Sequence, residues 1–166
     1  MITHYLCNPI TVKFKFMIQR IQSVYLFLAA IAVAVMFFFP IANFYSDTFY
    51  FYLSLGGISD DTFVTINTIP LIIIAVALIL LAVFSIFMYK NRLLQMRVLR
   101  FGVLLDLAFI IVIYFGYIDS ISQKANVEVQ YKTGIYFPLI MLVFLILAIR
   151  SIMADEKKVR AADRLR

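Results

Sequence analysis

Long apolar runs alternate with short polar connections along the chain, and this pattern predicts membrane-spanning helices. A hydrocarbon core about 30 Å thick needs about 20 apolar residues of helix. Runs of that length lie at about 21–39, 69–89, 98–117 and 135–153, and Pro40 follows the first. We therefore expect an all-α membrane protein, built as a four-helix transmembrane bundle.

The first apolar run could instead be a secretory signal peptide that is cleaved. Signal peptides have apolar regions of about 7 to 15 residues, followed by a small-residue cleavage site. Here the run is longer, and its A-x-A sequence, Ala32-Val33-Ala34, lies inside it. We interpret the first run as a retained anchor.

Two connections on the same side of the predicted bundle have strand character. In the first, residues 48–55 are rich in aromatic residues, a Gly-Gly pair follows at 56–57, and residues 62–66 are β-branched, which together predict a hairpin. In the second, residues 126–132 alternate apolar and polar side chains, as in a half-buried strand. A hairpin alone is marginal, so we expect a small outer antiparallel β cap of two to three strands. The alternative is two irregular aromatic loops lying in the membrane interface.

Composition supports a place in lipid. The chain has 166 residues, enough for one domain, with 64% apolar residues and a mean hydropathy of +1.00, well above soluble domains. A net charge of +6 could suggest nucleic acid. The basic residues, however, lie in short blocks beside the apolar runs, where they face lipid headgroups and set orientation. We therefore expect the lipid bilayer, and not nucleic acid, as a partner.

The distribution of Lys and Arg predicts the orientation, since short cytoplasmic segments are enriched in both. One side of the predicted bundle carries thirteen of them and the other side two, Lys124 and Lys132. The thirteen are Lys13, Lys15, Arg20, Lys90, Arg92, Arg97, Arg100, Arg150, Lys157, Lys158, Arg160, Arg164 and Arg166. We expect a multi-pass protein of the bacterial inner (cytoplasmic) membrane with both termini cytoplasmic.

The first 16 residues differ from the rest of the chain. They mix polar, Pro and apolar residues without a helical period, whereas Met17 opens a short basic flank followed directly by an apolar run. We expect residues 1–16 to be a non-native or disordered extension, residues 17–153 the four-span membrane domain, and residues 154–166 a cytoplasmic basic tail.

Cys7 and His4, the single cysteine and the single histidine of the chain, both lie in that extension. Without it the protein has no thiol and no imidazole, which excludes disulfides, Cys or His nucleophiles and His-ligated metals. We expect a protein that is not an enzyme, with no catalytic residues, no cofactor and no metal site.

Asp106 is a charged residue near the middle of the third predicted span. An ionised carboxylate there costs at least about 3 kcal/mol, so it should be protonated, paired or facing a wet interior. One interpretation is that Asp106 is an intramembrane polar site for a proton or cation. It could equally be a structural Asp bonded to a neighbouring helix, with Ser85 as a candidate partner.

Several short segments carry a family resemblance. They are Met17-Ile18-Gln19-Arg20-Ile21-Gln22, Lys90-Asn91-Arg92-Leu93-Leu94-Gln95, Asp155-Glu156, and Ala162-Asp163-Arg164-Leu165-Arg166. From Met17 to Arg166 the chain resembles a family of four-span membrane proteins of the Bacteroidota, domain of unknown function 4293 (DUF4293). The resemblance implies a start at Met17 and four spans, and it implies no activity. Asp106 lies outside the segments that carry it.

These segments cluster at the predicted cytoplasmic ends, which suggests a surface that binds another membrane or cytoplasmic protein. Its candidate residues are Gln19, Arg20, Lys90, Asn91, Arg92, Gln95, Asp163, Arg164 and Arg166. The simpler interpretation is that the basic residues only set the topology, but this does not explain the Gln, Asn and Asp residues. We expect a non-enzymatic accessory or scaffold subunit. The alternative is a small transporter or proton-coupled membrane protein that uses Asp106.

Overall fold

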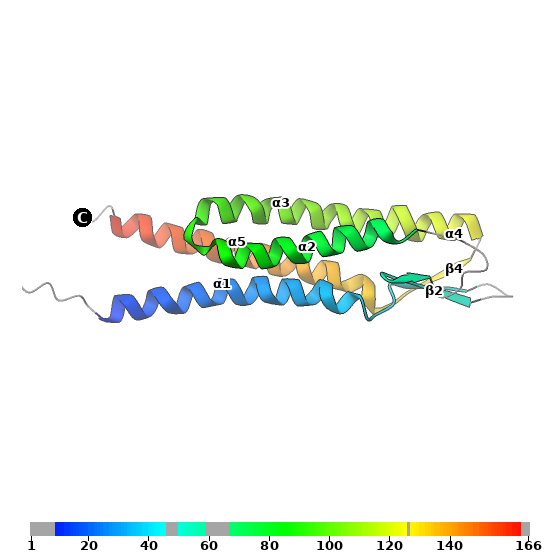
Figure 1. Cartoon of the computed structure of the whole chain (residues 1–166), viewed down its shortest axis with the longest axis horizontal. Helices are drawn as coiled ribbons and strands as arrows, with labels where there is room; N and C mark the ends of the chain where they lie inside the picture. The colour runs from blue at the N-terminus through cyan, green and yellow to red at the C-terminus, as the bar shows by residue number, and fades with distance from the viewer. Residues whose placement is uncertain (1–8, 46–49, 59–66, 126, 164–166) are drawn as a thin grey trace, which may run out of the picture.

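The structure is a computed structural model that describes residues 9–45, 50–58, 67–125 and 127–163, with side chains from residue 21 to residue 157 except at 90, 124 and 125. It is an elongated bundle of four helices with a small sheet at one end (Figure 1). Helix α1 begins and helix α5 ends at the opposite end. These are called the sheet end and the terminal end below.

The first helix is α1 (Pro9–Met36), and the second is α2 (Ile69–Phe87). The third starts as α3 (Arg92–Ile111), widens into a π-helical segment η2 (Val112–Asp119) and ends as α4 (Ser120–Ala125). The fourth is α5 (Tyr136–Asp163). Short 3₁₀ turns, η1 (Met88–Lys90) and η3 (Thr133–Ile135), precede α3 and α5.

The described part of the chain has four helices, the number predicted, and three of them are long and apolar enough to cross a membrane: Ile69–Phe87, Arg92–Gln123 and Thr133–Lys157. The apolar part of α1 with described side chains, Ile21–Met36, is shorter. Helix α1 ends three residues earlier than the predicted span, because 3₁₀-type bonds such as Phe38 N–H to the Val35 carbonyl (3.0 Å) tighten the chain before Pro40. Helix α5 runs ten residues past its predicted span, so the segment after residue 153 continues the helix to Asp163.

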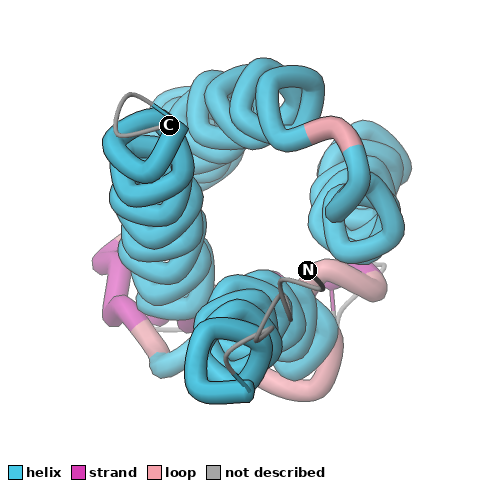
Figure 2. The backbone as a smooth tube through the Cα atoms, turned by 90° about the vertical axis from the view of Figure 1, so that its left-hand side faces the viewer, coloured by secondary structure: helices cyan, strands magenta, loops and turns pink. Residues whose placement is uncertain are grey.

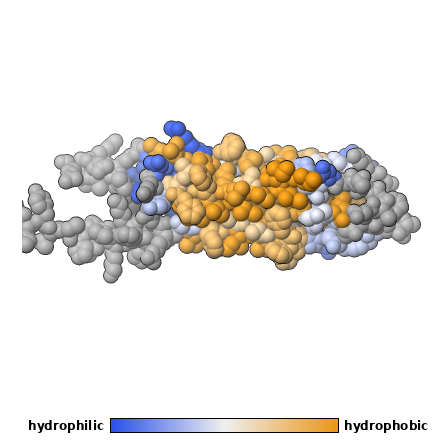
Figure 3. All heavy atoms as spheres, viewed as in Figure 1, coloured by the Kyte–Doolittle hydropathy of each residue, from blue (hydrophilic) through white to orange (hydrophobic). Residues whose placement is uncertain are grey.

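The helices form a ring in which α1 packs against α2 and α5, and α3 packs against the same two helices (Figure 2). The buried positions of α2 repeat every three or four residues: Leu71, Ala75, Leu78, Ala82 and Ser85. Such spacing places one narrow stripe of each helix in the core, as in coiled-coil packing. The opposite faces leave large apolar side chains exposed, and they form a band between the two ends (Figure 3).

The sheet has four antiparallel strands in the order β3-β2-β1-β4. They are β1 (Ala42–Tyr45), β2 (Tyr50–Ser54), β3 (Gly57–Ile58) and β4 (Glu128–Tyr131). Residue Ala42 of β1 lies opposite Leu53 on one side and Tyr131 on the other. An ordered antiparallel cap is therefore confirmed, and the alternative of irregular loops is wrong for these segments.

Two details of the predicted cap need correction. The sheet has four strands instead of two to three, because residues 42–45, which form β1, lie between the first predicted span and the predicted hairpin and were not predicted to be a strand. The first three residues of β1, Ala42, Asn43 and Phe44, are buried one after another, so it lacks the alternation that identifies a strand. The predicted hairpin paired residues 48–55 with residues 62–66. In the structure β2 pairs with β1 and β3, while residues 62–66 lie outside the described part of the chain.

Gly134 fixes the sheet end to the helices. Its N–H donates a hydrogen bond to the Pro40 carbonyl at 2.9 Å, and a Cβ at this position would lie 2.5 Å from the same oxygen. The segment entering α5 therefore passes directly against the segment leaving α1.

Candidate functional site

Polar side chains are buried inside the bundle on its third helix. Asp106 is fully buried near the middle of the helix, and Gln95, one turn from its start, is 3% exposed. Ser85, near the end of α2, is also fully buried. In an apolar environment such groups are costly unless they find partners, so their hydrogen bonds decide what each can do.

Gln95 joins the two helices that meet at the α2–α3 connection. Its side-chain Nε2 donates a hydrogen bond of 2.9 Å to the backbone carbonyl of Ser85. Helix α3 starts at Arg92, six residues before the predicted third span, so Gln95 lies within the helix and points inward. Among the proposed partner-binding residues, Gln95 is therefore a contact between helices rather than a surface residue.

A second contact joins the first and last helices. The amide of Gln22 on α1 donates a hydrogen bond to the carboxylate of Asp155 on α5, and both side chains are less than a tenth exposed. Sequence reasoning singled out both segments but did not pair them. One feature of the sequence could have indicated this pair: Gln22 lies near the start of the first predicted span and Asp155 just past the end of the last, and these two ends lie on the same side of a four-helix arrangement.

Asp106 has no comparable partner. Neither of its carboxylate oxygens has a hydrogen bond within the described part of the chain. The Ser85 hydroxyl oxygen and the Gln95 Oε1 also have no hydrogen bond there. The proposed hydrogen bond between Asp106 and Ser85 is therefore not formed. Ser85, Gln95 and Asp106 thus each have a polar side-chain oxygen in the bundle interior that forms no hydrogen bond with the described part of the chain.

The remaining candidates whose positions the structure describes lie towards the terminal end. Asn91 is exposed and Arg92 is partly exposed, both at the α2–α3 connection. The backbone of Gln19, Arg20, Lys90 and Asp163 is described, but their side chains are not, and Arg164 and Arg166 lie outside the described residues. Helices α1 and α5 are neighbours and extend past the α2–α3 connection (Figure 1).

The search for metal ligands covered only the described residues. Among them, no group of three or more His, Cys, Asp or Glu side chains could hold a metal ion. Among the described residues, Gln22, Asp155 and Gln95 join helices, and Asp106 places a carboxyl group inside the bundle.

Comparison with known proteins gives a family without an assigned activity. A family model described as "Domain of unknown function (DUF4293)" matches residues 18–165. A search of the curated proteins finds no match.

Proposed function

This chain belongs to the DUF4293 family, and from that premise we propose that it is an integral protein of the bacterial inner membrane that crosses the bilayer four times. The observation that carries this proposal is a belt of exposed apolar side chains around all four helices. One example from each helix is Phe27 (58% exposed), Leu80 (63%), Leu104 (65%) and Val143 (55%). Soluble monomers rarely expose apolar patches larger than a few hundred Å². Helix α2, with 19 residues, is about 28 Å long, which fits a hydrocarbon core of about 30 Å.

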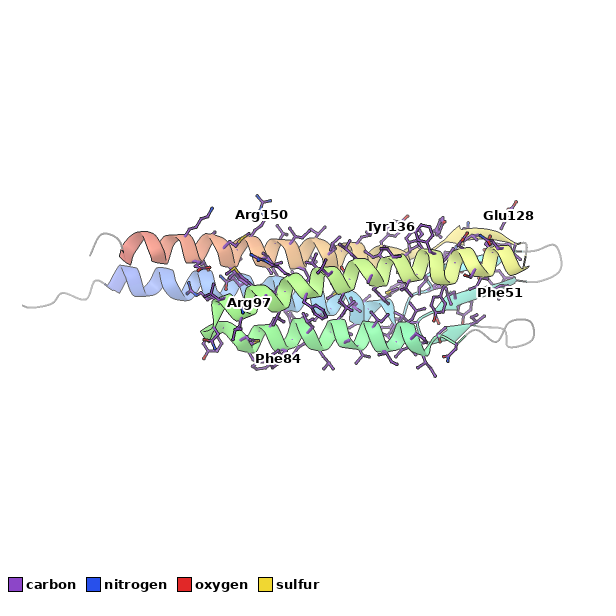
Figure 4. The ribbon with its side chains drawn as sticks, turned by 90° about the horizontal axis from the view of Figure 1, so that it is seen from above. Phe51, Phe84, Arg97, Glu128, Tyr136 and Arg150 are labelled. Carbon is purple, nitrogen blue, oxygen red and sulfur yellow. The ribbon has the colours of Figure 1, made fainter. Side chains whose placement is uncertain are left out.

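The charge distribution supports an orientation with the terminal end in the cytoplasm. Arg97 and Arg150 lie towards the terminal end, whereas Glu128 lies at the sheet end (Figure 4). In this orientation the tail from residue 154 is cytoplasmic, and the sheet caps the bundle on the outer side of the membrane.

Thiol labelling tests this placement. In a Cys7→Ser background, single cysteines replace the exposed residues Glu128 at the sheet end and Asn91 at the α2–α3 connection. A membrane-impermeant thiol reagent added to intact spheroplasts should label Glu128→Cys, and should label Asn91→Cys only after permeabilisation. The opposite pattern, or equal labelling of both, would contradict the orientation.

Within the membrane we propose that the protein is a non-enzymatic accessory or scaffold subunit that binds a partner through its terminal end. Two of the amides near this end, Gln22 and Gln95, form contacts between helices, so the candidate surface narrows to Asn91, Arg92 and the ends of α1 and α5. The extension of α1 and α5 past the α2–α3 connection supports this choice, because it offers a paired helical surface outside the bilayer.

Crosslinking in cells followed by affinity purification tests the scaffold proposal. We expect a stoichiometric partner that is lost when residues 163–166 are deleted and is retained in Glu128→Gln, a control at the other end of the bundle. Recovery of the chain alone from crosslinked cells, or a partner that survives the deletion, would contradict binding through the terminal end.

A second candidate function rests on Asp106. Its buried carboxyl group, which has no hydrogen-bond partner among the described residues, would suit a proton or cation site in a small transporter. The variant Asp106→Asn keeps the size of the side chain but cannot ionise. If growth and complex formation are unchanged in this variant, the transport interpretation fails.

A further inference from the structure

A half-open cavity of about 280 Å³ lies at the sheet end, between the π-helical segment and strand β4. Its lining includes Tyr114, Phe115, Asp119 and Tyr131, together with Ile118, Ser122 and Val129. π-helical turns are rare and often occur at functional sites. Here the widened turns hold two aromatic residues and an acidic residue along one wall of the cavity, and β4 supplies a third aromatic ring.

The cavity has one acidic side chain among its lining residues. Asp119 is exposed, and its Oδ2 accepts a hydrogen bond of 2.9 Å from the side-chain amide of Gln123. This bond fixes the carboxylate without neutralising it. The other lining side chains are aromatic, aliphatic or hydroxyl groups, so the charge of the cavity is negative and its complement is a cation.

The aromatic residues favour an organic cation over a bare metal ion. The rings of Tyr114 and Tyr131 lie with centroids 5.9 Å apart and planes inclined by 42°, so they form a corner of two aromatic surfaces. An ammonium group within about 6 Å of such a ring is attracted to its face. A primary ammonium also has three N–H donors, which a carboxylate and the tyrosine and serine hydroxyls of this cavity can accept.

The position of the cavity along the helix indicates where the cation comes from. Counting from Asp106 near the centre of the helix, Tyr114 lies about 12 Å and Asp119 about 20 Å towards the sheet end. The edge of the hydrocarbon core lies about 15 Å from the centre of the bilayer. The cavity therefore lies at the boundary between the acyl chains and the headgroups, with the backbone of Tyr114 on the acyl side and that of Asp119 on the headgroup side. Phe115 lines the cavity and is 71% exposed, so this side of the cavity faces the lipid in the proposed placement.

We propose that this cavity binds the headgroup of an outer-leaflet lipid that carries a primary ammonium, as phosphatidylethanolamine does. The ammonium lies beside Asp119 and over the rings of Tyr114 and Tyr131, and the acyl chains extend along the apolar belt past Phe115. The proposal rests on the membrane placement given above and adds a ligand class that the placement alone does not require.

Tryptophan fluorescence tests the proposal, since the chain has no tryptophan of its own. Phe115→Trp places a reporter in the cavity, and Phe84→Trp, 59% exposed on α2, places a matched reporter on the belt away from it. The full chain is reconstituted in vesicles of phosphatidylglycerol with increasing fractions of phosphatidylethanolamine whose acyl chains are brominated. Quenching of the Phe115→Trp fluorescence should show that the lipid beside this residue is phosphatidylethanolamine, bound about ten-fold more strongly than phosphatidylglycerol, which corresponds to about 1.4 kcal/mol. Quenching of the Phe84→Trp fluorescence should show no preference between the two lipids.

Variants identify the groups responsible. Combined with Phe115→Trp, the change Asp119→Asn should abolish the preference. Tyr131→Leu, which removes the ring, should weaken it several-fold, and Tyr131→Phe, which removes only the hydroxyl, should weaken it less. Glu128→Gln, a carboxylate at the same end that does not line the cavity, should leave it unchanged. A preference that survives Asp119→Asn, or is lost equally in Glu128→Gln, would overturn the proposal.

The same measurements distinguish a free amine from a lipid, and failure of the lipid site from failure of the membrane placement. If soluble glycerophosphoethanolamine competes as well as the lipid, the ligand is a free amine and the lipid assignment fails. If brominated lipids quench neither reporter, the membrane placement fails, whereas quenching of both reporters without a preference contradicts the lipid site alone.

Discussion

Gln22 and Gln95 have the same side chain, but the structure gives them different hydrogen bonds. Gln22 donates to a carboxylate on another helix, that of Asp155. Gln95 donates to a backbone carbonyl, and its own Oε1 is left without a partner in the described part of the chain. Hydrogen bonds to charged groups contribute about 1.5 to 3 kcal/mol, roughly twice the contribution of neutral ones. The two amides should therefore differ in their effect on stability.

Replacing each amide by leucine measures this difference. Gln22→Leu should lower the free energy of unfolding by about 1 to 3 kcal/mol, because it removes one hydrogen bond from a nearly buried carboxylate. Gln95→Leu should change it by less than about 1 kcal/mol, because the lost bond is offset by removal of the unbonded Oε1. Thermal unfolding of the purified variants in detergent, followed by circular dichroism, checks both values. Equal losses of unfolding free energy in the two variants would contradict the stronger hydrogen bond that is expected for Gln22.

Gly134 is a position where a single methyl group has no space. A Cβ would lie 2.5 Å from the Pro40 carbonyl oxygen and 2.9 Å from that of Phe39, and both are backbone atoms that cannot rotate away. Gly134→Ala should therefore lower the free energy of unfolding by about 2 kcal/mol or more. Gly56→Ala is the control, since the nearest atom to a Cβ there is 3.9 Å away. Unfolding midpoints in the same detergent compare the two, and a Gly134→Ala midpoint equal to that of Gly56→Ala would contradict the close approach.

Sequence patterns located the polar residues at the ends of the helices but not the direction in which they point. Gln95 precedes the predicted third span by three residues, and the extra helical turns before that span are what turn it into the core. Gln22 and Asp155 are far apart in the sequence, and only the packing of α1 on α5 brings them together. Hydrophobic periodicity reports which face of a helix is apolar, but it does not report the partner of a polar group on that face.

At the level of elements, the third and fourth predicted spans lie within long apolar helices of the structure, and the second, 69–89, runs two residues past the end of its helix at Phe87. Strand β1 was missed because its first three residues are buried one after another, and the π-helical segment was missed because its residues, 112–119, are as apolar as the helix before them. Strand β4 alternates because its outer face is exposed, and this is why its pattern was recognised.

Gly102 lies where helix α3 packs against both of its neighbours. A Cβ there would lie 2.8 Å from a methyl group of Leu81 on α2 and 3.9 Å from a methyl group of Leu145 on α5. Small residues allow such close packing between helices. Gly102→Val should therefore overpack the interface and lower the free energy of unfolding by about 1 to 3 kcal/mol.

Ala108→Val, on the exposed face of the same helix, is the matched control and should change the free energy of unfolding by less than about 0.5 kcal/mol. Unfolding in detergent by urea or heat measures both variants. If Gly102→Val is as stable as Ala108→Val, the side chain of Leu81 can move aside and the contact does not limit packing.

For the molecule as a whole, the proposed membrane placement predicts a preferred bilayer thickness. The exposed apolar band is set by α2, about 28 Å of helix, whereas the third helix, from Arg92 to Gln123, is about 48 Å and extends beyond the band into the sheet end. Stability should therefore be highest in bilayers with a hydrocarbon core near 30 Å, and should fall in clearly thinner or thicker ones by fractions of a kcal/mol per Å.

Reconstitution in a series of phosphatidylcholine vesicles that differ only in acyl-chain length measures this dependence, with the unfolding midpoint as readout. A midpoint that does not vary across the series would contradict a belt matched to the bilayer.

The position of β1 between β2 and β4 has a consequence for synthesis on the ribosome. β1 pairs first with a strand a few residues away, but its other edge pairs with Glu128–Tyr131, which is translated only after the second and third helices. Until then that edge presents unpaired backbone groups. α5, the last helix made, is the one that closes the ring against the first. A chain released early therefore carries both an open sheet edge and an open groove, features by which cellular proteases can distinguish an unfinished copy from a complete one.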